Sequence, residues 1–191
     1  MAPTLAASAA GYRALWAKCQ ITPSRLNEVH QRCGLILGNK ARYQAIEKIT
    51  SVPWFVVAAL HSRESDCDFN TYLGNGDPIY RRTTDVPAGR GPFATFEAGA
   101  EDALALDGLS SVKVWPVEAC LYYPERFNGW GYYSVGENSP YVWAATNLQQ
   151  AGKYVGDGAF SRTAWDTQLG VAAILKGLVA MDTDIGIPVA A

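Results

Sequence analysis

A glutamate at position 64 stands at the end of the most apolar segment of the chain. The run from Trp54 to Leu60 predicts a buried helix that continues to about Glu64. The spacing of Trp54, His61 and Glu64 places all three on one helix face. Apolar surroundings and the negative end of a helix dipole both raise the pKa of a carboxyl group. A carboxyl kept protonated in this way suits a general acid, but these residues alone equally allow an ion pair with an arginine such as Arg63.

The pattern changes abruptly after this helix. Residues 65–92 are rich in Gly and Pro, and Asn75-Gly76-Asp77-Pro78 is a strong turn signal. This composition predicts a small β-hairpin lobe at about residues 65–92. Glu64 would then lie at the border between a buried helix and this lobe.

Several segments of the chain together resemble the lysozyme-like superfamily. The first group comprises 61–69 (HSRESDCDF), 72–78 (YLGNGDP), Thr83-Thr84, 86–90 (VPAGR) and Phe93. The second group comprises 125–129 (ERFNG), 138–143 (NSPYVW), Asn147 and 152–158 (GKYVGDG). The resemblance spans roughly residues 12–175. It is closest to phage-type endolysins and bacterial lysozyme family proteins, with goose-type lysozymes and lytic transglycosylases as relatives.

The resemblance implies that Glu64 is the catalytic acid, and it implies roles for the residues that follow. In phage lysozymes an aspartate and then a threonine follow the catalytic glutamate, and Asp77 with Thr83 reproduces that second interval. Thr84 is an equal candidate on chemical grounds. For the second carboxylate, Asp85 is an alternative, and Asp66 and Asp68 are closer to Glu64 in sequence. An aspartate in such a turn can also simply hydrogen-bond its own backbone.

Aromatic residues and one asparagine suit a glycan-binding cleft. Sugar rings stack on Trp and Tyr, and an Asn side chain bonds hydroxyl or acetamido groups. The segment 127–129 (FNG) resembles a cleft-floor motif of goose-type lysozymes and lytic transglycosylases, which implies that Asn128 orients an N-acetyl sugar. Tyr132, Tyr141 and Trp143 are the expected lining residues. The alternatives are a turn-forming Asn and aromatic rings that belong to the core.

The resemblance implies a peptidoglycan-degrading glycoside hydrolase. Such an enzyme, an N-acetylmuramidase, cleaves the β-1,4 bond between N-acetylmuramic acid and N-acetylglucosamine by general acid catalysis. A lytic transglycosylase acting on the same bond is the first alternative. A non-catalytic module that binds the cell wall is the second.

Helical patterns dominate the rest of the chain. Apolar stripes predict helices near residues 12–19, 23–37, 43–49, 93–106, 115–123 and 141–149, and a last helix capped by Thr163. We therefore expect a mainly α (α+β) fold, a lysozyme-like helical domain with the small hairpin lobe. Residues 1–11 are predicted to be a flexible lead-in, and residues 12–185 a single catalytic domain.

Composition limits the possible partners and cofactors. The 191 residues carry a net charge of −2, which gives no general case for nucleic-acid binding, and no apolar run is long enough to span a membrane. Residues 1–96 carry +4 and residues 97–191 carry −6, so the basic half could face an anionic wall polymer. Two histidines and four cysteines without a CxxC pair predict no metal site, and we expect no cofactor.

The start of the chain bears on where the protein acts. Residues 1–11 lack the basic and apolar regions of a signal peptide. We therefore expect a monomer made in the cytoplasm, which acts on peptidoglycan in the cell wall after release or secretion.

Overall fold

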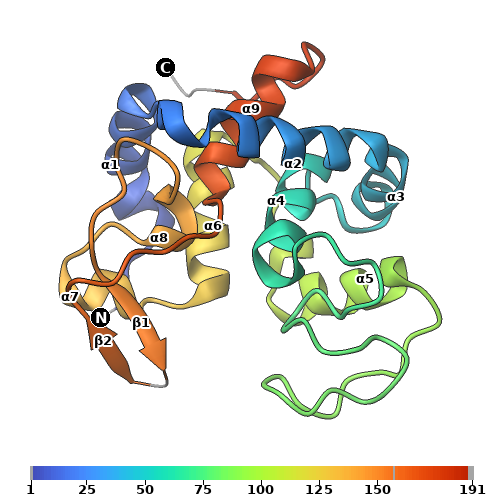
Figure 1. The fold of residues 1–191 in the computed structure, drawn as a ribbon. Coiled ribbons are helices and arrows are strands. Elements are labelled where there is room, and N and C mark those ends of the chain that lie inside the picture. The colour runs from blue at the N-terminus through green and yellow to red at the C-terminus, as the bar shows by residue number, and fades with distance from the viewer. Residues whose placement is uncertain (1, 157, 189–191) are drawn as a thin grey trace. The chain divides into compact units, whose positions relative to one another are not determined.

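Most of the chain is α-helical. The structure is a computed structural model that describes residues 2–156 and 158–188 (Figure 1). Within these residues it contains nine α-helices and one two-stranded antiparallel hairpin. The predicted fold class, mainly helical with a small β part, is confirmed.

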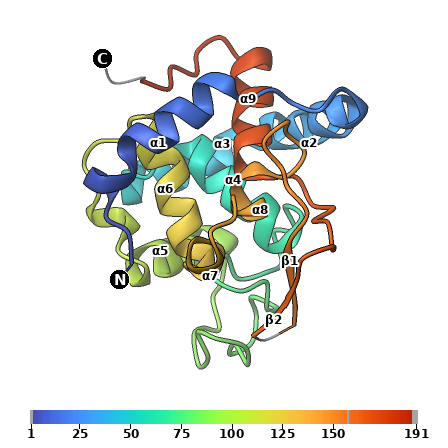
Figure 2. The same cartoon turned by 90° about the vertical axis from the view of Figure 1, so that its left-hand side faces the viewer.

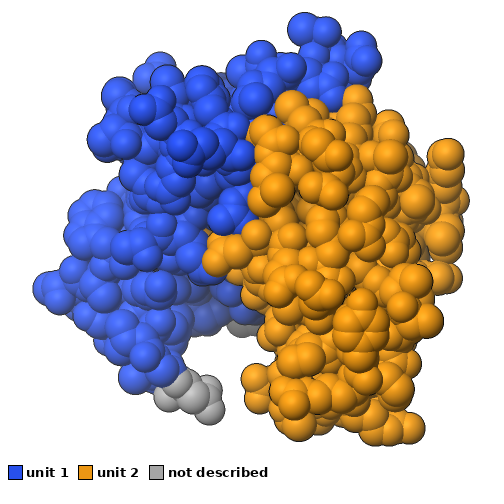
Figure 3. All heavy atoms as spheres, turned by 45° about the vertical axis from the view of Figure 1, so that its right-hand side comes forward, with its two compact units in different colours: residues 1–33, 116–191 blue, residues 34–115 orange. Residues whose placement is uncertain are grey.

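The chain divides into two compact units, which Figure 3 colours separately. Unit 1 comprises residues 1–33 and 116–191, and unit 2 comprises residues 34–115. The first boundary falls inside helix α2 (Leu26–Gly38), so this helix begins in unit 1 and ends in unit 2. Unit 2 is therefore one continuous stretch inserted between the two parts of unit 1.

Unit 1 is built around the pairing of its first helix with a helix from the second half of the chain. Helix α1 (Leu5–Lys18) runs beside α6 (Val117–Asn128), as Figure 2 shows. The other elements of the unit are α7 (Gly131–Val135), α8 (Pro140–Trp143), β1 (Lys153–Gly156), β2 (Ala159–Ser161) and α9 (Val171–Met181). A 3₁₀ turn at Pro23–Arg25 leads into α2. Helix α8 contacts both α6 and α9.

Two glycines allow α9 to pack closely in unit 1. Gly170 precedes the helix, and a Cβ atom added there would lie 2.5 Å from the Val142 carbonyl oxygen and from the Ala144 nitrogen. A Cβ at Gly177 would lie 2.6 Å from Val29. The close approach at both positions therefore requires the absence of a side chain.

Unit 2 packs three helices around an apolar core. Helix α3 (Lys40–Thr50) contacts both α4 (Trp54–Ser65) and α5 (Phe96–Leu106), and a 3₁₀ turn (Leu109–Ser111) contacts α5 and α3. Helix α4 is buried from its first residue through Arg63, as its apolar sequence predicts. The largest buried side chains of the unit include Tyr43, Ile46, Leu60, Tyr72, Phe96 and Leu104.

The structure places the β-hairpin in a different segment from the one predicted. Strands β1 and β2 pair at residues 153–161, where Tyr154 lies opposite Phe160. The predicted segment, residues 65–92, contains an isolated antiparallel bridge between Thr71 and Pro78 and no strand. The physical reason is the density of prolines and glycines there, since proline has no amide to donate to a ladder and glycine weakens a strand.

The first helix begins earlier than predicted. Residues 5–11, predicted to be a flexible lead-in, belong to α1. The alanine-rich sequence favours a helix, and the Thr4 hydroxyl caps it by accepting a hydrogen bond from the Ala7 amide (3.3 Å).

All four cysteines, Cys19, Cys33, Cys67 and Cys120, are buried thiols that form no disulfide in this structure. Among the helices described, none is both long and apolar enough to cross a membrane.

The contact at Gly170 predicts the outcome of a glycine substitution. Gly170→Ala should lower the free energy of unfolding by roughly 1–3 kcal/mol, because the added methyl group would overlap the backbone at Val142 and Ala144. The control is Gly34→Ala in α2, where nothing lies within 4 Å of the new Cβ. That change should stabilise by up to about 1 kcal/mol through helix propensity. Denaturant unfolding measures both, and equal stability of the two variants would contradict the packing described.

Candidate functional site

Glu64 lies in the last turn of α4 and is partly exposed, whereas the ten residues before it are buried. The helix ends because Asp66 and Cys67 adopt left-handed backbone conformations, with φ of 55° and 65°. The Asp66 amide donates to the Ser62 carbonyl, and the Cys67 amide donates to the His61 carbonyl, both at 3.2 Å. These bonds satisfy carbonyls at the helix end and turn the chain away from it.

A buried histidine fixes the chain that follows Glu64. The His61 Nε2 lies 3.0 Å from the Asp68 carbonyl oxygen and its Nδ1 lies 2.9 Å from the Tyr43 hydroxyl. A carbonyl only accepts, so Nε2 donates to Asp68, and Nδ1 hydrogen-bonds the Tyr43 hydroxyl. The ring also packs against Phe69 and Phe96, with centroids 4.8 and 4.1 Å away. His61 therefore has a structural role at this site.

The turn that carries Asp77 packs against the end of α4. The Tyr72 amide donates to the Asp77 carbonyl (2.7 Å), which closes the turn. Gly76 lies within it at φ 77°, and a Cβ there would lie 3.0 Å from the Glu64 carbonyl oxygen. Glycine is thus required by both the backbone conformation and the contact. The structure brings the Asp77 turn and the backbone of Glu64 together.

The Asp77 carboxylate organises the next loop. Its Oδ2 accepts hydrogen bonds from the Thr84 amide (2.7 Å) and the Asp85 amide (3.0 Å). The bonds from the Asp85 and Thr84 amides lower the pKa of Asp77, so it is ionised at neutral pH. The Asp77 carboxylate therefore hydrogen-bonds nearby backbone amides, as an aspartate in a turn can, and it is negatively charged.

The two candidate threonines have different surroundings. Thr83 is buried, and its hydroxyl donates to the Pro87 carbonyl (2.6 Å) and accepts from the Arg90 amide (3.0 Å). Thr84 is exposed, and its hydroxyl lies 3.5 Å from Asp77 Oδ2. Thr84 is thus the threonine open to a ligand next to Asp77, and Thr83 is engaged within its own loop.

The loop is tied to α5 by a charged contact. The Arg90 guanidinium binds both carboxylate oxygens of Asp102, and the Tyr72 hydroxyl donates to Asp102 (2.8 Å). The Tyr72 ring stacks on Phe93 with centroids 5.3 Å apart. Paired, bidentate contacts of this kind hold a loop in one orientation.

The other alternative carboxylates lie nearby in the chain. Asp66 is the C-terminal cap of α4, and Asp85 is exposed beside the Asp77 network. The Asp68 carboxylate is exposed and accepts from the Asn70 amide (2.9 Å), which lowers its pKa. No described group of three or more His, Cys, Asp or Glu residues is arranged to hold a metal ion.

The expected sugar-binding residues belong to unit 1. Asn128 is the last residue of α6 and is exposed. Tyr132, Tyr141 and Trp143 are 7%, 3% and 1% exposed, so little of each ring is open to a ligand from solvent. The exposed aromatic of this segment is Tyr133, at 54%.

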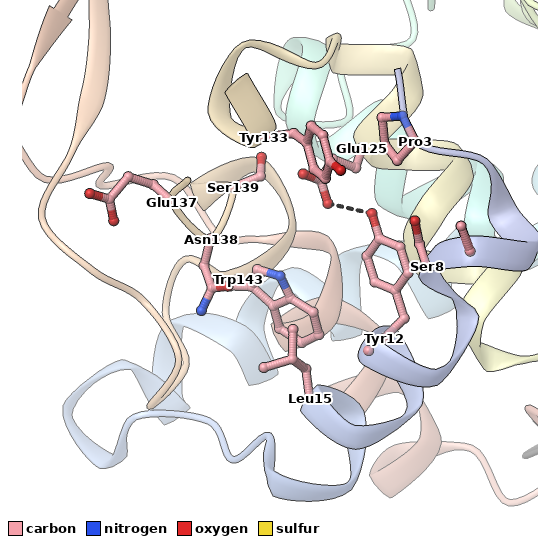
Figure 4. A pocket seen from close by; sticks show the side chains of 12 residues that line it. Pro3, Ser8, Tyr12, Leu15, Glu125, Tyr133, Glu137, Asn138, Ser139 and Trp143 are labelled. Carbon is pink, nitrogen blue, oxygen red and sulfur yellow. Dashed lines mark hydrogen bonds between the residues drawn. The ribbon is translucent and has the colours of Figure 1, made fainter. Parts of the chain in front are cut away.

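Unit 1 also contains a pocket that the sequence did not reveal. The pocket measures about 320 Å³ and is lined by residues of α1, α6 and the segment from α7 to α8 (Figure 4). It includes Glu125, which is 6% exposed and accepts a hydrogen bond from the Tyr12 hydroxyl (2.7 Å). Burial raises the pKa of Glu125, and the bond from Tyr12 opposes this shift.

A signal for Glu125 was present in the sequence. It lies four residues after Leu121 and eight after Val117, on the apolar stripe of α6. A carboxyl group at such a position needs either a buried partner or a functional reason. No comparable signal marks Tyr12, which lies 113 positions away.

No family model matches the chain, and no curated protein or solved structure is significantly similar to it.

The Asp77 network predicts a local change in backbone protection. Asp77→Ala should speed amide hydrogen exchange at Thr84 and Asp85, because both amides lose their acceptor. The protection in the native protein should also fade as the pH falls through the lowered pKa of Asp77, since the neutral carboxyl accepts less strongly. Exposed Asp85 is the control site, and Asp85→Ala should leave the Thr84 amide protected. Unchanged exchange in Asp77→Ala would contradict the network.

The burial of Glu125 predicts a pH-dependent effect of its isosteric replacement. A carboxyl whose pKa is raised by folding stabilises the protein at low pH, and this contribution is lost as pH rises through the folded pKa. Glu125→Gln stays neutral, so its stability relative to the native protein should rise between pH 4 and pH 8. Denaturant unfolding across this range measures the difference. If the stability difference between Glu125→Gln and the native protein does not vary with pH, folding does not raise the pKa of Glu125.

Proposed function

We propose that the protein is a peptidoglycan-degrading glycoside hydrolase, an N-acetylmuramidase in which Glu64 is the general acid. The observation that carries the proposal is the position of Glu64 within unit 2. It is the first partly exposed residue after ten buried positions of α4, and the turn of Asp77 packs on its carbonyl. A carboxyl at the edge of an apolar helix, with an anionic carboxylate on the adjoining turn, is the pair that glycoside hydrolysis needs.

The division of roles follows from the surroundings of each group. Glu64 gives its proton to the glycosidic oxygen as the bond to the muramic acid carbon breaks. Asp77 stays ionised because backbone amides donate to it, and an anion there stabilises the positive charge that develops on the sugar ring. Water then adds to the ring carbon and gives a proton to the Glu64 carboxylate, which completes hydrolysis and restores the acid.

Thr84 in unit 2 and Asn128 in unit 1 are the exposed polar side chains among those that the resemblance singles out. The Thr84 hydroxyl lies beside the Asp77 carboxylate and is exposed, so it can orient a water or a sugar hydroxyl. The Asn128 amide is exposed at the end of α6 and can bond an acetamido group. The buried rings of Tyr132, Tyr141 and Trp143 support this segment rather than offer open stacking faces. The protein acts, on this proposal, as a monomer on the glycan strands of the wall.

Glu64→Gln tests the role of the acid. This variant should fold normally and lose on the order of 10²-fold or more of its activity on purified peptidoglycan, because the amide cannot give up a proton in the reaction. The release of reducing ends measures activity, and circular dichroism checks folding. The matched control is Glu101→Gln on α5, an exposed glutamate of the same unit, which should keep full activity.

The products distinguish the proposal from its alternatives. Reducing muramic acid ends in the mass spectrum indicate hydrolysis. Anhydro-muramic acid ends would instead indicate a lytic transglycosylase, in which a sugar hydroxyl replaces water. Binding to peptidoglycan without any cleavage by the native protein would indicate a wall-binding module. Full activity in Glu64→Gln would show that the acid is another residue.

A further inference from the structure

The pocket of unit 1 has an unusual combination of lining groups. Its ionisable acids are Glu125 and Glu137, and no Lys, Arg or His side chain is among the lining residues described. Tyr12, Tyr133 and Trp143 add aromatic surface to the same walls. At about 320 Å³ it is at the small end of the range of about 300–1,000 Å³ typical of ligand pockets.

Glu125 is buried, and no cation is among the described residues that line its pocket. Its one hydrogen bond within the described structure comes from the neutral Tyr12 hydroxyl (2.7 Å), at Oε2. Glu137 differs, because it lies 3.9 Å from the exposed Arg162, and Figure 4 shows its carboxylate turned away from Glu125. Burying a carboxylate without an opposite charge costs free energy, so a positive ligand next to Glu125 would offset that cost.

The buried Ser139 hydroxyl of the same pocket has no hydrogen-bond partner among the described residues. Ser139 is 1% exposed, and its Oγ makes no hydrogen bond to any residue that the structure describes. Buried polar atoms are nearly always hydrogen-bonded, and an unsatisfied one at a pocket wall points to a group that a ligand supplies. This observation is independent of Glu125, since Ser139 comes from the segment before α8 (Figure 4).

One aromatic ring of the pocket is open to the apolar part of a ligand. Trp143 and Tyr12 are almost fully buried, whereas Tyr133 is 54% exposed at the pocket. An exposed tyrosine ring offers apolar surface on which a carbon chain can pack. A neutral polyol could also stack on this ring, but it would leave the Glu125 charge uncompensated.

We propose that this pocket binds a small organic ammonium ion. The ammonium group donates hydrogen bonds to Glu125 and to the Ser139 hydroxyl, and the carbon chain lies against the exposed ring of Tyr133. Tyr12 holds the Glu125 carboxyl in place through its hydroxyl. This proposal does not rest on the hydrolase activity, because every group it uses lies in unit 1 and none is Glu64 or Asp77.

Direct titration of the whole protein with small probes tests the site. The probes are pentylammonium and tetramethylammonium, with the neutral 1-pentanol and N-acetylglucosamine as comparisons. Calorimetry should show saturable binding of pentylammonium at neutral pH, with pentanol and the sugar binding at least tenfold more weakly. Tetramethylammonium should bind more weakly than pentylammonium, because it has no N–H to donate.

Two variants and one control locate the contacts. Glu125→Gln should weaken pentylammonium binding about tenfold or more, since it removes the charge and keeps the shape. Ser139→Ala should weaken binding several-fold while leaving the unliganded protein as stable as the native one, or more so, since the unpaired hydroxyl is removed. The control is Glu28, an exposed glutamate of α2 in the same unit. Glu28→Gln should change neither the affinity for pentylammonium nor the stability of the unliganded protein.

The contrary outcomes are equally definite. Absence of saturable amine binding, or equal affinity in Glu125→Gln and the native protein, would overturn the proposal. Tighter binding of N-acetylglucosamine or pentanol than of pentylammonium would assign the pocket to a neutral ligand instead. If Glu125→Gln does not fold, the Ser139→Ala variant decides. Unchanged pentylammonium affinity in that variant would contradict binding of the ammonium group by both Glu125 and Ser139. Because the readout is binding rather than cleavage, it is unaffected by the result for Glu64.

Discussion

One buried imidazole fixes the direction in which the chain leaves α4, and the candidate site of unit 2 depends on that direction. His61 is fully buried, and its two ring nitrogens hydrogen-bond the Asp68 carbonyl and the Tyr43 hydroxyl. A ring with both nitrogens engaged cannot rotate without leaving a buried polar atom unpaired. The segment beyond α4 is thereby held so that the turn of Gly76 ends against the Glu64 carbonyl. The contact between the Asp77 turn and the Glu64 backbone therefore depends on a residue that takes no part in the proposed chemistry.

The parts of the fold that the sequence predicted are those governed by local patterns. The apolar run from Trp54 predicted α4 and the place of Glu64 at its end, because burial of a continuous apolar helix needs no information from distant residues. The Asn75–Pro78 turn was predicted for the same reason, since its residue types specify a turn by themselves. The choice between Thr83 and Thr84 was not predictable, because it depends on loop contacts with Pro87 and Arg90.

Where long-range packing decides, sequence patterns were insufficient. Helix α6 was expected to end near Tyr123, yet it continues through Pro124 to Asn128, since contacts with α1 and α8 outweigh one missing backbone bond. The last helix begins at Val171 rather than near Thr163, because the close contact at Gly170 sets its start. The burial of the aromatic residues could not be predicted either. A ring that stacks on a sugar and a ring that fills a core have identical sequence signals.

The order of the two units along the chain bears on synthesis. Unit 2 is continuous, so all of residues 34–115 leave the ribosome before α6 has been made. Helix α1 has to wait for that helix, since Tyr12 bonds Glu125 from 113 positions away. Nascent chains with exposed apolar surface are prone to aggregate. The Tyr12 and Trp16 side of α1 is therefore a surface that stays exposed on the growing chain until α6 is made, and that a chaperone would shield.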